Sequence, residues 1–104
     1  MSIEAEVLWL DEHRFVGLRE LCELSGLREA ELLELVHSGA ITASETSGAD
    51  YRFSARVITV ARTACRLRND FELDTRGLSV ALRLLERVHE LEDEVATLRV
   101  QIPR

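Results

Sequence analysis

The chain of 104 residues is 46% hydrophobic and carries a formal net charge of −6, with 13 basic against 19 acidic residues. This length supplies one small domain with a modest hydrophobic core and leaves no room for a second. Every basic residue is an arginine. Lysine-dependent sites are therefore excluded, among them the phosphate-binding P-loop, Schiff-base chemistry and a lysine general base.

The first apolar stretch lies within Ile3–Leu10, which we predict to be a short strand of a small sheet. Its apolar core is too short for a signal peptide or a membrane span, so we expect a cytoplasmic protein. In that compartment two cysteines far apart in sequence, Cys22 and Cys65, are expected to be reduced thiols packed in the core.

Two helices separated by a short turn follow. The first is predicted over residues 17–24 and ends at Gly26; the second is predicted over residues 28–38 and ends at Gly39. The inward positions are Leu18, Leu21 and Cys22 in the first helix and Leu32, Leu35 and Val36 in the second. Helix, glycine-containing turn and helix is the pattern of a helix-turn-helix.

The next segment predicts a β-hairpin wing and a third helix. Residues 40–42 and 51–53 are β-prone and surround a polar loop. Ser54 is a suitable N-cap for a helix that runs to about residue 69. The inward positions of this helix are expected to be Val57, Val60, Ala61, Ala64 and Leu67.

A short acidic connector, Asp70–Asp74, leads into the last helix. Asp74 is placed to cap that helix and to complement its N-terminal dipole. We expect the two apolar residues of the connector, Phe71 and Leu73, to hold it against the core.

The segment Thr75–Ile102 predicts a long helix with a heptad seam. The seam residues are Ala81, Leu84, Val88, Leu91, Val95, Leu98 and Ile102. The charges beside the seam can meet an opposite charge in either strand orientation; they are Arg87, Glu92, Glu94 and Arg99. We expect this helix to hold a homodimer, and the alternative is an ordinary amphipathic helix packed on its own domain.

The order of these elements resembles a MerR-like winged helix-turn-helix, a mainly α fold with a small β wing and a long C-terminal dimerisation helix. It predicts a single domain with its winged part over about residues 1–74 and its long helix over about 75–102. A closer resemblance rests on residues 67–85, LRNDFELDTRGLSVALRLL, and 21–27, LCELSGL. Together with the positions Glu29, Leu32, Leu35, Val36 and Gly39, these segments resemble the chaperone modulators of the CbpM type.

That resemblance implies a protein that binds the J domain of a CbpA-type Hsp40 co-chaperone and inhibits its stimulation of Hsp70. J domains present a basic helix to Hsp70, so a competitor should offer carboxylates. The second helix supplies them, and it predicts a J-domain-binding site made of Arg28, Glu29, Glu31, Leu33 and Glu34. We expect Glu31 and Glu34 to be exposed there. The alternative sites are the wing and the carboxylates Asp70, Glu72 and Asp74.

A DNA-binding transcriptional regulator is the competing hypothesis, because this fold is common among such proteins. Its support is a group of arginines, namely Arg52, Arg56, Arg62 and Arg66. The second helix, which would enter the major groove, has one arginine against three glutamates, so DNA binding is not expected. We interpret the arginines as partners of the acidic connector and the long helix, within or between subunits.

Nothing in the chain predicts an enzyme. His13, His37 and His89 lie far apart, and neither histidines nor cysteines have the spacing of metal ligands. We assign no catalytic residue, no cofactor and no metal.

Overall fold

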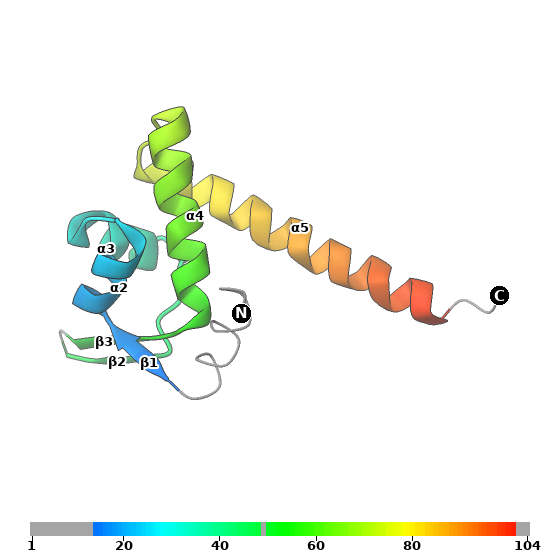
Figure 1. The fold of residues 1–104 in the computed structure, drawn as a ribbon, viewed down its shortest axis with the longest axis horizontal. Coiled ribbons are helices and arrows are strands. Elements are labelled where there is room, and N and C mark those ends of the chain that lie inside the picture. Colours follow the sequence, from blue (N-terminus) through cyan, green and yellow to red (C-terminus); the bar gives the residue numbers. More distant parts are fainter. Residues whose placement is uncertain (1–13, 49, 102–104) are drawn as a thin grey trace.

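The computed structural model describes residues 14–48 and 50–101, so the predicted strand Ile3–Leu10 and the seam residue Ile102 lie outside the described part. Within it, three helices and three short strands form a compact body, and the fourth and longest helix projects from that body (Figure 1). None of the described helices is long and apolar enough to cross a membrane.

The sheet has the strand order β1-β3-β2 and is antiparallel throughout. Its strands are β1 (Phe15–Gly17), β2 (Glu45–Ser47) and β3 (Asp50–Ser54). Val16 of β1 lies opposite Phe53 of β3, and both side chains are buried. This cross-strand pair joins the sheet to the core, whereas all of β2 is exposed, as expected of a wing.

The predicted first strand of the wing, over residues 40–42, is wrong. Ala40 and Ile41 form a bend instead, because their N–H groups both donate to the carbonyl of Leu35, at 3.0 and 3.1 Å, and Thr42 is not part of a strand either. The bonds satisfy a carbonyl at the end of the preceding helix and direct Ile41 into the core. Strand pairing starts only afterwards, where the N–H of Ser44 donates to the carbonyl of Arg52 at 2.8 Å.

The helix-turn-helix is confirmed as α2 (Leu18–Ser25) and α3 (Glu29–His37). Gly26 ends α2 in the left-handed region at φ 87°, where its N–H donates to the carbonyl of Cys22 at 2.9 Å. A side chain there would be strained by the backbone and would also meet Cys65, whose Sγ lies 3.0 Å from the position of a Cβ. The turn therefore requires glycine for two reasons.

The third predicted helix is α4 (Arg56–Phe71), and its N-cap is Ala55 rather than Ser54. Ser54 is still paired in the sheet, opposite Phe15. Ile58 is buried on α4 together with the expected Ala61 and Ala64. The other expected positions are half-buried against the core, namely Val57, Val60 and Leu67.

The connector is only partly as predicted. Leu73 packs on the core and Asp74 caps the last helix, its Oδ1 accepting the N–H of Gly77 at 2.8 Å. Phe71 is 67% exposed, so the expectation that it anchors the connector is wrong. It is the last residue of α4, and Glu72 follows in the left-handed region at φ 53°; it is Leu73, after that turn, that reaches the core.

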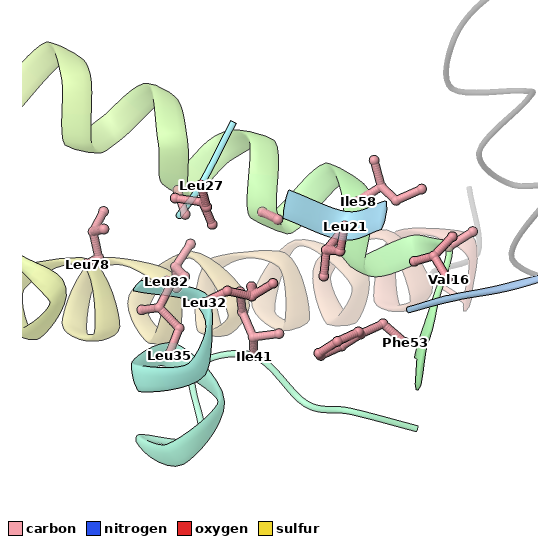
Figure 2. Packing of buried hydrophobic residues seen from close by; sticks show 13 residues of the cluster. Val16, Leu21, Leu27, Leu32, Leu35, Ile41, Phe53, Ile58, Leu78 and Leu82 are labelled. Carbon is pink, nitrogen blue, oxygen red and sulfur yellow. The ribbon is translucent and has the colours of Figure 1, made fainter. Parts of the chain in front are cut away.

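The last helix, α5 (Thr75–Gln101), enters the core only with its first turns. Leu78 and Leu82 are buried members of the core cluster, at the place where α5 contacts α3 and α4 (Figure 2). The core cluster is Val16, Leu21, Leu27, Leu32, Leu35, Ile41, Phe53, Ala55, Ile58, Ala61, Ala64, Leu78 and Leu82. Beyond these turns α5 leaves the body as a rod (Figure 1).

Candidate partner-binding and self-association surfaces

The outer face of α3 presents the acidic surface that the sequence predicts, with one exception. Glu29 and Glu34 are exposed, Leu33 is half-buried, and the side chain of Arg28 is largely in solvent. The inward face is as expected: Leu32 and Leu35 are fully buried, and Val36 packs at the edge of the core. We call Glu29, Leu33 and Glu34 the α3 outer face.

Glu31 is the exception, because only 6% of it is exposed and the prediction that it faces solvent is wrong. Its Oε1 accepts the backbone N–H of Arg28 at 3.0 Å and the Nε–H of Arg28 at 3.1 Å. The same oxygen accepts a hydrogen bond from Nη1 of Arg68, which reaches across from α4. Glu31 therefore ties the start of α3 to α4 and is not a contact surface.

The surroundings of Glu31 shift its ionisation. Burial alone raises the pKa of this carboxyl, but the hydrogen bonds from Arg28 and the charges of Arg68 and Arg28 outweigh burial and hold the pKa below its ordinary value. The carboxylate is therefore charged at neutral pH, and two guanidinium groups compensate that charge.

Sequence inspection did not identify Arg68 as a core-facing residue, although a signal for it was present. Ala61, Ala64 and Arg68 follow a spacing of three and four, which places them on one face of a helix. A charged residue on the buried face of a helix requires an opposite charge nearby. The partner, Glu31, lies 37 residues earlier, and helix periodicity says nothing about which distant carboxylate it is.

Polar contacts join α3 to the start of α5. Oγ1 of Thr75 donates to Oε2 of Glu34, the hydroxyls of Ser38 and Ser79 lie 2.8 Å apart, and Nη2 of Arg83 donates to the carbonyl of Ser38. Since Thr75 directly follows Asp74, these bonds bring Glu34 close to the acidic connector. The predicted site on α3 and one of its two alternatives, the connector, therefore meet where Glu34 contacts Thr75.

The connector carboxylates differ in how far they are already engaged. Asp70 and Glu72 are exposed, whereas Asp74 accepts the N–H of Gly77 as the N-cap of α5. A partner that used Asp74 would compete with that helix cap. Asp70 and Glu72 are thus the more accessible members of this group.

Arg52 and Arg62, two of the four grouped arginines, make contacts that differ from our interpretation of that group. Arg52 pairs with Glu45 across the wing at 3.6 Å, and Nε of Arg62 donates to the carbonyl of Leu24 at 3.1 Å. These contacts run to the wing and to α2, and not to the connector or α5. Arg62 thereby satisfies a carbonyl at the C-terminal end of α2, which also favours a positive charge.

The heptad seam of α5 lies uncovered on the single chain. Ala81 is half-buried, and five further seam residues are 43–62% exposed, namely Leu84, Val88, Leu91, Val95 and Leu98. They follow the turns of α5 in which Leu78 and Leu82 are buried in the core. A continuous apolar stripe of this kind on a projecting helix is typical of an interaction surface.

The surroundings of Cys22 do not activate its thiol. Cys22 and Cys65 are free and half-buried, and burial together with the nearby charges of Glu29 and Glu23 raises the pKa of Cys22. A raised pKa disfavours the thiolate, which is the reactive form. Among the residues that the structure describes, no three His, Cys, Asp or Glu side chains come together as a group that could hold a metal ion.

Comparison with known proteins agrees with this architecture. Residues 16–100 match the family described as MerR HTH family regulatory protein. The chaperone modulatory proteins CbpM of Salmonella paratyphi B, Salmonella newport and Salmonella heidelberg are each 38% identical to this chain over 87 residues, which cover 84% of the chain and 86% of the relative. The chain therefore belongs to the MerR helix-turn-helix family and, within it, to the family of chaperone modulatory proteins CbpM.

Proposed function

We propose that this protein is a non-enzymatic chaperone modulator that binds the J domain of a CbpA-type Hsp40 co-chaperone and lowers its stimulation of Hsp70. The observation that carries the proposal is its similarity to chaperone modulatory proteins CbpM over most of both chains. We propose a J domain as the partner because an acidic surface suits a basic partner, and complementary charge steers and orients the encounter of two proteins.

The α3 outer face is the surface that we assign to the J domain. Glu29 and Glu34 supply exposed carboxylates, and the half-buried Leu33 between them supplies apolar contact area. Arg28 lies at the edge of this surface. Because its guanidinium pairs with Glu31, we assign it a role in starting the helix rather than in supplying charge to the J domain. The connector that carries the exposed Asp70 and Glu72 leads into α5 at Thr75, which contacts Glu34.

Titration calorimetry with the isolated J domain of the host CbpA-type protein tests this assignment. Reversing Glu29 and Glu34 to lysine replaces attraction by repulsion and should weaken binding about tenfold or more. The matched control reverses Glu86 and Asp93, two exposed carboxylates of α5 off the seam, for the same change of net charge. Unaltered affinity in the α3 variant would move the site to Asp70 and Glu72, and no binding by the unmodified protein would contradict the J-domain proposal.

Self-association along α5 is part of the same proposal. The uncovered seam needs a narrow apolar partner, and a second copy of α5 supplies one with the same heptad spacing. The flanking residues carry both signs of charge, with Arg87 and Glu94 on one side and Glu92 and Arg99 on the other. A homodimer would cover the seam and leave the α3 outer face free on each subunit.

DNA binding is the second candidate function, because the matched family is one of helix-turn-helix regulatory proteins. The charge on α3 argues against it: Glu29 and Glu34 face outward where a recognition helix would approach phosphates, and Arg28 is already paired with Glu31. We expect no tight sequence-specific site at physiological salt. A gel-shift selection from random DNA checks this, and recovery of a nanomolar site would restore the regulator hypothesis.

A further inference from the structure

Glu31 occupies a place on α3 that an apolar residue would ordinarily fill. Successive residues of an α-helix are about 100° apart, so Glu31 lies about 40° from Leu35 and about 100° from Leu32 when viewed down the axis. Both leucines are fully buried, and Glu31 continues their arc at the N-terminal end of the helix. The core side of α3 therefore ends in a carboxylate.

The position of Glu31 determines which residues of α3 face outward. Glu29 and Leu33 are each two positions away, about 200° around the helix, so fixing Glu31 inward turns both of them outward. Arg68 holds the carboxylate from α4, and Arg68 is itself held, since its Nη2 donates to Sγ of Cys65 at 3.6 Å. The contact thus fixes the rotation of the first turn of α3 relative to α4.

The contact also fixes where α3 begins. Glu31 accepts the backbone N–H of Arg28, which is otherwise one of the free donors of the helix N-terminus. Arginine has no acceptor on its side chain, so Arg28 cannot return the bond as a serine or threonine N-cap would. The start of α3, immediately before Glu29, depends on Glu31 and through it on Arg68.

We propose that Glu31 and Arg68 are positioning residues of the partner-binding surface, which hold the α3 outer face in the orientation that the J domain recognises without contacting the J domain themselves. This inference rests on the proposed function. An apolar pair could fill the same space with similar stability, as is often found when buried ion pairs are replaced. Such a pair would not reproduce the directed bonds of the carboxylate to Arg28 and Arg68.

The experiment separates folding from orientation by using the full chain with Glu31→Met and Arg68→Met combined. We expect a thermal melt close to that of the unmodified protein and a J-domain affinity reduced about tenfold, since preorganisation is lost while packing remains. Arg68→Lys, which keeps a cation beside Glu31, should restore most of the affinity that Arg68→Met alone loses. Ile58→Val, a core change on the same helix, serves as the control for general destabilisation.

Each outcome bears on the proposal. The proposal is overturned if the double variant binds the J domain within about twofold of the unmodified protein. If the double variant does not fold, the same criterion applies to Arg68→Met alone. Affinity that falls equally in Ile58→Val also overturns it, because the effect would then follow stability alone. If the unmodified protein does not bind the J domain, the proposed function fails and the positioning role fails with it, whereas binding without an effect of these variants removes the positioning role only.

Discussion

The body and the projecting part of α5 differ in how far their apolar side chains are buried. In the body, Leu21, Leu32, Leu35 and Phe53 are fully buried by contacts within one chain. Along α5, seam residues with the same chemistry remain about half exposed. The body can fold on its own contacts, whereas the seam gains its stabilisation only when something else covers it.

A second contrast lies in how the two regions use charge. The body contains the buried Glu31, which two arginines compensate, while the ion pair between Arg87 and Glu90 on α5 is solvent-exposed at 3.0 Å. Exposed pairs of this kind contribute about 0–1 kcal/mol, and breaking a buried one costs several times more. The buried charges of the body therefore contribute to its stability, whereas the exposed ion pair on α5 contributes little.

The largest effect is expected from breaking the seam. Replacing Val88 and Leu91 by aspartate should convert the proposed dimer to a monomer, because each apolar side chain lost from a packed interface costs on the order of 2–5 kcal/mol and two like charges would face their copies. Light scattering measures the change. Val100→Asp is the control, since Val100 is 87% exposed and lies off the seam. A dimer that survives the seam changes, or is lost equally in the control, would place the interface elsewhere.

A change in the body should act on folding instead. Leu35→Ala removes a fully buried side chain beside α5 and should lower the free energy of unfolding by about 2–5 kcal/mol. Leu84→Ala removes the same atoms from the seam, and its cost should shrink as the protein is diluted and the proposed dimer dissociates. Urea unfolding at several protein concentrations measures both. Concentration-dependent losses of equal size for the two variants would contradict the distinction between body and seam.

The buried carboxylate predicts a pH dependence that belongs to the body. The pKa of Glu31 is lowered in the folded state from its ordinary value of 4.5, so the unfolded chain binds a proton there more readily than the folded one. The stabilisation of the folded state by the ionised Glu31 is therefore complete above pH 4.5, and it is lost as the pH falls through the lower pKa that Glu31 has in the folded state. Denaturation of Glu31→Gln between pH 7 and pH ~3 should show a shallower loss of stability than the unmodified protein. Parallel profiles would assign the acid sensitivity to other groups.

The smallest effect is expected at the junction between the two regions. Glu72 adopts φ 53°, a conformation that costs a residue with a Cβ more than it costs glycine. Glu72→Gly relieves this strain but also loosens the unfolded chain, so the net gain should be about 0.5 kcal/mol. The thermal melt of this variant should therefore rise slightly. A fall would show that the Glu72 side chain makes a stabilising contribution greater than the backbone strain.

Local patterns in the sequence determined the helices and the long seam. Apolar residues recurring every three to four positions mark α2, α3, α4 and α5, and Gly26 and Gly39 mark two helix ends because only glycine adopts positive φ readily. The fold class and the family resemblance followed from the order of these elements and from the segment 67–85. Such signals are readable because each depends on neighbours within one or two turns of the chain.

The tertiary structure decided which residues meet across long separations. The partner of Glu31 is Arg68 and the partner of Glu34 is Thr75, each pair about forty residues apart, and no periodicity encodes such a choice. The same limit explains the errors at residues 40–42 and Phe71, where hydrophobic composition indicated a strand and a core anchor. At the start of that segment, the N–H groups of Ala40 and Ile41 bond to the carbonyl of Leu35 at the end of α3 and so do not pair in a strand. After α4, the turn at Glu72 brings Leu73, and not Phe71, to the core. A local pattern states that a side chain is apolar or charged, but the packing of distant elements decides whether it is covered and by what.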